Sequence, residues 1–350
     1  MNDVMTERNS HDIIQLRVIM QDLSAYNSFG LKVRADELIK IRDLDDLRRA
    51  PSERILILGR GSDILLTDDY HGTVLVNHIK RLDISCDGDD YIVKAGGGLI
   101  LDELIEVLIS KNIPGLENLS AIPGTVGAAP IQNVGAYGME IGQVIEKVSF
   151  FDLDKRTQGE FSREQCEFGY RSSYFKQHRD FRYFITEVTF RLSSQFKPKL
   201  SYHGLAGENL STPFEVRERV IKLRNAKLPD PKQVGNAGSF FKNPIVSQDK
   251  AEELKRLYPL MPVYPQIDGT VKLAAGWLID AAGCRNITHG HAGTWEHQAL
   301  VIVNRGDARP HEIVALAKYI VSEVMNRFDI ELEPEVRIYG RDGEIAWHSL

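Results

Sequence analysis

The chain has few cysteines, no long apolar run and no excess of positive charge, and each absence excludes a class of protein. Its three cysteines, Cys86, Cys166 and Cys284, are far apart and form no Cys-x-x-Cys pair, which argues against a disulfide framework or a zinc site. The formal net charge of -6 argues against nucleic acid as a partner, because binding a phosphate backbone needs a basic face. No apolar stretch reaches membrane-spanning length, and the first residues lack the apolar core of a signal peptide. We therefore expect a cytoplasmic protein with no membrane partner.

Several catalytic signatures are absent as well. The turn from Gly59 to Gly61 does not continue as Gly-x-Gly-x-x-Gly into a helix, so a Rossmann dinucleotide site is not expected. Ser239 lies among small residues without a Gly-x-Ser-x-Gly elbow or an evident His-Asp pair, so proton donation suits it better than nucleophilic attack. The tract with His289, His291 and His297 lacks the His-Glu-x-x-His spacing, which favours ordinary loop histidines over a metal site.

The most informative segment that is present runs from Gly115 to Gly138. It contains five glycines and two prolines, so it holds neither a regular helix nor a strand for long. The residues between the glycines are apolar, which predicts a loop packed into the interior, where its N–H groups need partners. Two interpretations stay open. Either a ligand with phosphates and ring heteroatoms lies along the bare backbone, or the loop is a tight crossover between packed layers.

Apolar periodicity predicts strands on both sides of this loop and three helices. A chain of 350 residues exceeds the usual size of a single core and should divide into two or three domains. The segment Leu228-Pro-Asp-Pro ends a helical pattern and is the best junction between domains. The expected strands cover 54–59, 72–77, 91–95, 147–154 and 182–192, and the expected helices cover 101–110, 216–223 and 310–328.

Arg171 stands out because Tyr170, Ser172, Ser173 and Tyr174 surround it in sequence. A lone arginine among hydroxyl groups is more often a solvated ion-pair partner than a catalytic group.

Several separate motifs then occur in one order: Leu-Ile-Leu-Gly-Arg-Gly-Ser-Asp, Pro-Gly-Leu-Glu-Asn-Leu, Ile-Pro-Gly-Thr-Val-Gly, Pro-Ile-Gln-Asn-Val-Gly-Ala-Tyr-Gly, Phe-Gly-Tyr-Arg, Lys-Leu-Pro-Asp-Pro, Gly-Asn-Ala-Gly-Ser-Phe-Phe-Lys-Asn-Pro, Lys-Leu-Ala-Ala-Gly-Trp-Leu-Ile-Asp and Leu-Glu-Pro-Glu-Val-Arg. From about Ser28 to Gly340 the chain resembles UDP-N-acetylenolpyruvoylglucosamine reductase, a flavoenzyme family of bacterial cell-wall precursor synthesis. It resembles the longer form, in which a tyrosine loop covers the substrate, because Lys-Leu-Ser-Tyr-His-Gly-Leu places Tyr202 in that loop.

The resemblance implies an α+β fold of three domains, two forming a non-Rossmann FAD-binding fold and one binding the substrate. The implied parts are a disordered tail over 1–17, the first FAD-binding domain over 18–78 plus 336–350, the second over 79–226, and the substrate-binding domain over 227–335. We expect a monomer.

The resemblance also implies which residues bind and react. The implied catalytic residues are Arg171, Ser239 and Glu335. The implied FAD contacts are Gly59, Arg60, Gly61, Ser62, Asp63, Ile122, Pro123, Gly124, Gly127, Gln132, Asn133, Gly135, Ala136, Tyr137, Arg224 and Arg337. The implied substrate contacts are Tyr202, Lys227, Asn243 and Gln298, and no metal is implied.

In the implied reaction NADPH reduces FAD, and the reduced flavin passes hydride to UDP-N-acetylglucosamine enolpyruvate. Arg171 is the fixed cation for the charge that builds on the substrate carboxylate, Glu335 is a neighbouring hydrogen-bonding carboxyl, and Ser239 protonates the adjacent carbon. The chain departs from the family at Asp63, where Asn is usual, and a carboxylate beside a pyrophosphate is repulsive. It also departs over His291 to His297, where the family often has a less bulky stretch.

Two other readings remain open. One is a flavin-binding protein of related fold without this reductase activity, and the other is a metal hydrolase built on the three histidines.

Overall fold

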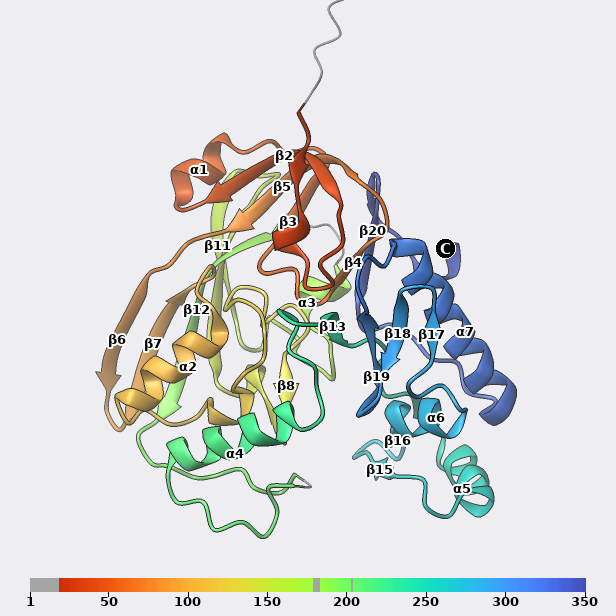
Figure 1. Cartoon of the computed structure of the whole chain (residues 1–350). Helices are drawn as coiled ribbons and strands as arrows, with labels where there is room; N and C mark the ends of the chain where they lie inside the picture. Colours follow the sequence, from red (N-terminus) through yellow and green to blue (C-terminus); the bar gives the residue numbers. More distant parts are fainter. Residues whose placement is uncertain (1–18, 179–182, 203) are drawn as a thin grey trace, which may run out of the picture.

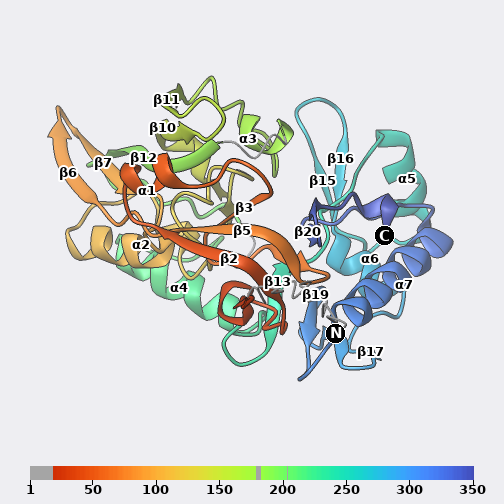
Figure 2. The ribbon, with the colours of Figure 1, turned by 90° about the horizontal axis from the view of Figure 1, so that it is seen from above.

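The computed structural model describes residues 19–178, 183–202 and 204–350, which form several sheets with helices packed on them (Figure 1). The disordered tail expected over 1–17 lies outside the described residues, as does His203 of the tyrosine loop. Seen from above, the C-terminal helices α5 (Gln248–Leu257), α6 (Ala275–Ala281) and α7 (Pro310–Phe328) lie on one side of the molecule, and α2 (Leu101–Ser110) lies on the other (Figure 2).

The N-terminal sheet has the order β1-β2-β5-β3 and delivers the chain into the glycine turn at Gly59. Its last three strands run parallel, and α1 (Leu44–Arg49) lies in the crossover between two of them. The helix begins at Asp43, whose side chain accepts a hydrogen bond from Asp46 N at 2.9 Å. The strands are β1 (Gln21–Asp22), β2 (Arg34–Ile41), β3 (Ile55–Leu58) and β5 (Tyr70–Asn77), and a 3-10 turn covers Ser24–Tyr26.

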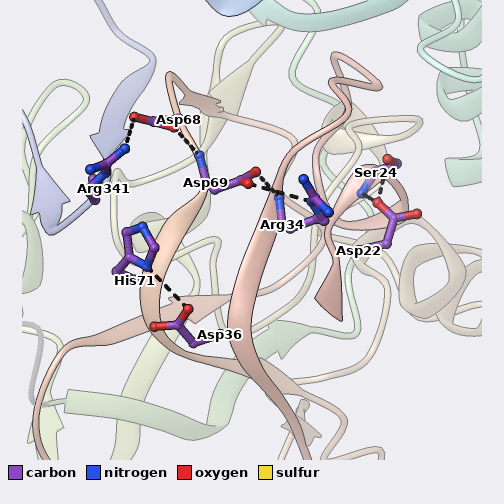
Figure 3. Close-up of polar contacts among 8 residues, drawn as sticks. All are labelled: Asp22, Ser24, Arg34, Asp36, Asp68, Asp69, His71 and Arg341. Atoms are coloured by element: carbon purple, nitrogen blue, oxygen red, sulfur yellow. Dashed lines mark hydrogen bonds and ion pairs between the residues drawn. The ribbon is translucent and has the colours of Figure 1, made fainter. Parts of the chain in front are cut away.

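Near its C-terminal end the chain completes a separate three-stranded sheet of order β21-β20-β4. Strand β20 (Arg337–Gly340) pairs in parallel with β4 (Ile64–Leu66) and antiparallel with β21 (Gly343–Glu344). Figure 3 shows polar contacts close to the two sheets: Arg341, just after β20, lies 3.5 Å from Asp68, and His71 Nδ1 on β5 lies 3.2 Å from Asp36 on β2. The residues just before β20 are thereby held beside the glycine turn.

The middle of the chain forms a five-stranded antiparallel sheet of order β11-β10-β12-β7-β6. The helix expected over 101–110 is confirmed as α2, and it buries Leu101, Leu104, Ile105 and Leu108 as its pattern predicts. The strands are β6 (Leu82–Asp87), β7 (Asp90–Gly96), β10 (Ile145–Asp152), β11 (Thr157–Ser162) and β12 (Tyr183–Ser193). Shorter elements of this region are 3-10 turns at Glu117–Leu119 and Ile141–Gln143, strands β8 (Gly135–Ala136) and β9 (Met139–Glu140), and α3 (Tyr174–Gln177).

Helix α4 (Pro213–Asn225) leads out of the middle region, and its Thr212 and Glu215 form a capping box. Beyond it, a four-stranded sheet of order β13-β19-β18-β17 and a three-stranded sheet of order β14-β16-β15 pack with α5, α6 and α7. The strands are β13 (Gly235–Ser239), β14 (Ile245–Val246), β15 (Val263–Pro265), β16 (Val271–Leu273), β17 (Thr288–His289), β18 (Ala292–Trp295) and β19 (Gln298–Asn304). A last 3-10 turn covers Trp347–Ser349.

The long helix expected from Pro310 is confirmed as α7. It turns its predicted apolar face inward: Ile313, Leu316, Ala317, Ile320, Val324 and Phe328 are buried. The same core cluster contains residues of the N-terminal strands, such as Leu65 and Val74. The N-terminal and C-terminal parts therefore share one hydrophobic core, which does not mark where one domain ends and the next begins. The expected domain boundaries stay a prediction.

Within the described part of the chain, no helix combines the length and apolar character needed to cross a membrane. Cys86 is exposed, Cys166 and Cys284 are buried, and all three are free.

Candidate active site

A cavity of about 750 Å³ lies where the N-terminal sheet, the glycine loop, the end of α4 and the strand β20 meet. Most of the residues predicted to bind FAD line it, together with all three predicted catalytic residues. The lining includes Gly59, Arg60, Gly61, Ser62, Asp63, Ile122, Pro123, Gly124, Gly127, Gln132, Gly135, Ala136, Arg224 and Arg337, with Arg171, Ser239 and Glu335.

The glycine turn between β3 and β4 is held by a close backbone approach and by the Ser62 side chain, whose Oγ donates to Pro123 O at 3.0 Å. Gly61 has φ +60°, and a Cβ atom there would lie 1.9 Å from the carbonyl oxygen of Tyr26. Its own carbonyl accepts a hydrogen bond from Ser28 N at 2.9 Å. Only glycine permits both the left-handed φ and this close approach, so the turn has a fixed shape before any ligand arrives.

The glycine loop proves to be packed into the interior, as its apolar residues predict. Leu119 and Val126 are fully buried. Several of its N–H groups find partners in the protein, since Val126 N donates to Leu99 O at 2.8 Å and Gly127 N donates to Gly97 O at 2.9 Å. The crossover interpretation therefore explains part of the loop. Gly124, with φ +138°, lines the cavity, and among the described residues an added Cβ there would meet one atom, Ser62 Oγ at 3.4 Å.

Three buried polar atoms on the cavity wall have no hydrogen-bond partner within the described ranges. They are Ser28 Oγ, Thr125 Oγ1 and Gln132 Oε1. Buried polar atoms are nearly always satisfied, so these three are suited to a polar ligand. Two hydroxyl groups and an amide oxygen fit the phosphates, hydroxyls and ring N–H group of FAD, which the resemblance implies.

Arg171, Glu335 and Ser239 come together from three distant parts of the chain. Arg171 Nε donates to Glu335 Oε1 at 2.8 Å, and Arg171 Nη2 donates to Gly135 O at 2.8 Å. Both side chains of the ion pair are mostly buried, with exposed fractions of 21% and 12%. Glu335 N donates to Phe240 O at 2.8 Å, which fixes Glu335 next to the end of β13, where Ser239 lies. Arg171 itself has φ +51°, a conformation that a non-glycine residue adopts only when its surroundings hold it.

The carboxyl group of Asp63 belongs to this same polar cluster. Burial raises its pKa well above the ordinary value, the negative charge of Glu335 raises it further, and the cations of Lys176, Arg171 and Arg337 oppose the rise. Its backbone oxygen accepts from Arg337 N at 3.2 Å. Asp63 is therefore set among the predicted catalytic residues, where a neutral carboxyl resembles the amide that the family usually has.

The two arginines predicted to contact FAD differ in their surroundings. Arg337 forms a two-pronged contact with Glu344, with Nη2 to Oε2 at 2.8 Å and Nε to Oε1 at 3.2 Å. Burial lowers the pKa of Arg224, while Tyr137 and Asp102 favour its charged form. Both guanidinium groups are largely buried at the cavity wall. An anionic ligand would form strong charge-assisted hydrogen bonds with them there.

Two residues predicted to contact FAD do not line the cavity. Asn133 is tied into the protein, because Nδ2 donates to Glu140 Oε2 and Gly169 O while Oδ1 accepts from Gly142 N. The ring of Tyr137 packs edge-on against Tyr202, with centroids 5.1 Å apart.

The four residues predicted to bind the substrate, Tyr202, Lys227, Asn243 and Gln298, also lie outside the cavity lining. Asn243 Oδ1 accepts from Ala275 N at 2.9 Å, at the start of α6. Lys227 lies two residues beyond the end of α4, and Gln298 begins β19.

The sequence reasoning did not single out Ser28 and Lys176. Ser28 contributes one of the partnerless hydroxyls, and Lys176 Nζ is buried without a hydrogen-bond partner among the described residues. No local pattern marks either of them, because a serine before Phe-Gly and a lysine in a short helix are common. As for the histidine tract, His291 Nδ1 lies 3.6 Å from Glu312 and His297 Nε2 lies 3.5 Å from Glu296. Across the described ranges, no three His, Cys, Asp or Glu residues gather as a metal site would need.

Comparison with known proteins fits this site. Residues 36–154 match the model of an FAD-binding domain, and residues 230–339 match the C-terminal domain of UDP-N-acetylenolpyruvoylglucosamine reductase. Together with the cavity, these matches define the class of the protein: it is an FAD-binding oxidoreductase.

Sequence and structure comparisons with individual proteins identify the family to which the chain belongs. The chain is 43% identical over 332 residues to UDP-N-acetylenolpyruvoylglucosamine reductase of Pectobacterium atrosepticum, covering 92% of this chain and 96% of that one. It is 40% identical to the enzyme of Escherichia coli K12 over 93% of this chain and 97% of that one. The crystal structure of the Thermus caldophilus enzyme shares the fold, with a TM-score of 0.66 and 23% identity over 92% of this chain and 98% of that one. The chain belongs to the UDP-N-acetylenolpyruvoylglucosamine reductase family. The resemblance and the α+β fold expected from the sequence are thus confirmed, and the comparisons do not favour the flavin-binding protein without reductase activity.

Proposed function

We propose that this protein reduces UDP-N-acetylglucosamine enolpyruvate to UDP-N-acetylmuramate with electrons from NADPH, and that the cavity described above is where it does so. Bound FAD supplies the hydride chemistry, accepting hydride from NADPH and delivering it to the enol ether carbon distal to the substrate carboxylate. The chain itself must bind both reactants, hold their charges and move one proton.

The glycine turn and the glycine loop hold the cofactor in this proposal. Gly59, Arg60, Gly61, Ser62 and Asp63 form one wall. Ile122, Pro123, Gly124, Gly127, Gln132, Gly135 and Ala136 form the other, with Arg224 and Arg337 as cationic contacts. The partnerless atoms of Ser28, Thr125 and Gln132 support this placement. Asn133 and Tyr137 act indirectly in this proposal: they hold the shape of the glycine loop and do not line the cavity.

Arg171 stabilises the negative charge that develops on the substrate carboxylate when hydride arrives. Its Nε and Nη2 groups are engaged by Glu335 and Gly135, which fixes the guanidinium plane and leaves Nη1 for the substrate. Ser239 donates its hydroxyl proton to the carbon next to that carboxylate. The hydride and the proton together saturate the double bond of the enolpyruvyl group.

The UDP-sugar binds on the side of the site toward the C-terminal sheets, through Tyr202, Lys227, Asn243 and Gln298. The packing of Tyr202 against Tyr137 supports a substrate loop that meets the glycine loop directly. We further propose that the protein acts in the cytoplasm as a monomer, without nucleic acid or membrane as a partner.

The observation that carries the proposal is the convergence of the Arg171–Glu335 pair with Ser239 on the wall of a cavity whose partnerless atoms suit FAD. The test is NADPH consumption by the purified, FAD-loaded protein with UDP-N-acetylglucosamine enolpyruvate. UDP-N-acetylglucosamine, which lacks the enolpyruvyl group, is the matched control. Consumption that is equal with both compounds, or absent with both, would reject the reductase and favour a flavin-binding protein of related fold.

A further inference from the structure

Asp102, in the first turn of α2, joins three segments that are far apart in the sequence. Its Oδ1 accepts a hydrogen bond from Ala121 N at 2.6 Å and another from Arg217 Nη1. Its Oδ2 accepts from Arg217 Nη2 at 3.2 Å. One carboxylate therefore ties α2 to the start of the cavity-lining part of the glycine loop and to α4.

The contact with Arg217 is two-pronged and largely shielded from water. The Arg217 side chain is 11% exposed and the Asp102 side chain is 31% exposed. Burial by itself would raise the pKa of Asp102, but the hydrogen bonds from Arg217 and from Ala121 N outweigh it and hold the pKa below its ordinary value. The carboxylate is thus ionised at neutral pH, and a charge-assisted fork of this kind fixes the geometry of both partners.

On the loop side, the bond holds an unfavourable conformation. Ala121 has φ +59°, a left-handed conformation in which the Cβ atom of an alanine crowds the backbone, so that it is unfavourable for any residue except glycine. The residues that follow it, from Ile122 to Thr125, line the cavity, as does Gly127. Without the carboxylate, nothing among the side-chain hydrogen bonds of the described residues holds the Ala121 N–H group in place.

On the helix side, Arg217 lies seven residues before Arg224, which is close to two turns of α4, so the two share a face. Arg224 lines the cavity and is largely buried. The negative charge of Asp102 favours the charged form of the Arg224 guanidinium group. A shift of α4 relative to the glycine loop would therefore move a cationic wall residue.

We infer that Asp102 is a positioning residue for the cofactor: by clamping Ala121 to Arg217, it fixes the glycine loop against α4 and so pre-organises the FAD cavity. This inference rests on the proposed function, since it takes the cavity as the FAD site. Pre-organisation raises affinity because the ordering is complete before the ligand binds.

The test measures the FAD dissociation constant of the flavin-free protein by quenching of flavin fluorescence. Asp102→Ala and Arg217→Met should each weaken FAD binding about tenfold, the factor that a loss of about 1.4 kcal/mol gives. The double variant should be no weaker than the worse single one, because both changes break the same contact. Arg217→Lys, which keeps the charge but not the fork, should fall between wild type and Arg217→Met.

Two further variants separate positioning from general stability and from direct contact. Arg219→Met removes another ion pair of α4, with Glu208 at 2.8 Å, and should leave the FAD affinity within about twofold of wild type. Adding Ala121→Gly to Asp102→Ala should recover much of the lost affinity, because glycine adopts the left-handed conformation without a clamp.

The inference is overturned if Arg217→Met and Arg217→Lys both bind FAD as wild type does, or if Ala121→Gly gives no recovery. The latter result would mean that Asp102 contacts FAD itself. A wild-type protein that binds no FAD would instead overturn the proposed function.

Discussion

Replacing Arg171 by lysine tests the chemistry of the site more sharply than removing the charge altogether. Arginine makes two hydrogen bonds of 2.8 Å, from Nε to Glu335 and from Nη2 to Gly135 O. In the proposed mechanism its Nη1 group binds the substrate carboxylate. A lysine ammonium keeps the charge but cannot hold Glu335, Gly135 and a substrate carboxylate in one plane. Hydrogen bonds to charged groups contribute about 1.5 to 3 kcal/mol each. A loss of about 3 kcal/mol corresponds to roughly 100-fold in rate.

The loss should appear in only one half-reaction. Reduction of the flavin by NADPH involves no substrate carboxylate, so bleaching of the flavin should proceed at nearly the wild-type rate in Arg171→Lys. Reoxidation by UDP-N-acetylglucosamine enolpyruvate should slow by roughly 100-fold. Stopped-flow absorbance resolves both steps.

Arg191→Lys is the matched control, because Arg191 also pairs with carboxylates, Glu146 at 2.7 Å and Asp87 at 3.0 Å, but lies exposed on β12. It should leave both rates unchanged. Wild-type reoxidation in Arg171→Lys would refute the guanidinium role, and equal slowing of both half-reactions would mean that Arg171 supports the flavin site instead.

Three other changes test neighbouring parts of the site. Ser239→Ala should bleach normally but reoxidise about 100-fold or more slowly in stopped-flow, and Ser239→Cys should recover part of that rate because it keeps a proton donor. Gly61→Ala should abolish stoichiometric flavin binding, since its Cβ would lie 1.9 Å from Tyr26 O, whereas Gly88→Ala, with the same φ of +60° and nothing within 4 Å, should keep it. Asp63→Asn should raise the melting temperature increasingly as pH rises from 5 to 8. Folding raises the pKa of the Asp63 carboxyl group, so this group stabilises the fold fully at a pH below the pKa it has in the unfolded chain. The stabilisation is lost as the pH rises through the pKa that it has in the folded protein. A constant difference across this range would show that Asp63 does not titrate there.

Local patterns were enough to predict the elements that build the scaffold. The spacing of Leu101, Leu104 and Leu108 predicted α2, and the apolar residues between the glycines predicted that the loop after it is buried. These signals are local, since periodicity and glycine content are read from neighbouring residues. From the order of the motifs we also predicted most of the residues that line the cavity, including Arg171, Ser239 and Glu335.

The surroundings of individual side chains could not be predicted in the same way. Asp63 lines the cavity as expected, but the sequence did not predict that the charges of Glu335 and Arg171, both far away in sequence, act on its carboxyl group. Gln132, Gly135 and Ala136 line the cavity, but Asn133 and Tyr137 of the same motif do not. Both of these residues adopt a left-handed backbone conformation, with φ of +47° and +50°. No sequence pattern predicted the contact between Asp102 and Arg217, because both are ordinary charged residues of helices.

The parallel pairing of β20 with β4 has a consequence for biosynthesis. Translation delivers Gly59 to Asp63 early, but Glu335 and Arg337 emerge only after every other wall residue except Tyr339. Domains generally fold as they leave the ribosome, N-terminal ones first, yet this cavity is incomplete until its final strand arrives. With FAD in the proposed place, a complete site for the cofactor would exist only late in the synthesis of the chain. An mRNA cut short before the Glu335 codon would encode the whole segment that matches an FAD-binding domain without encoding the complete cavity.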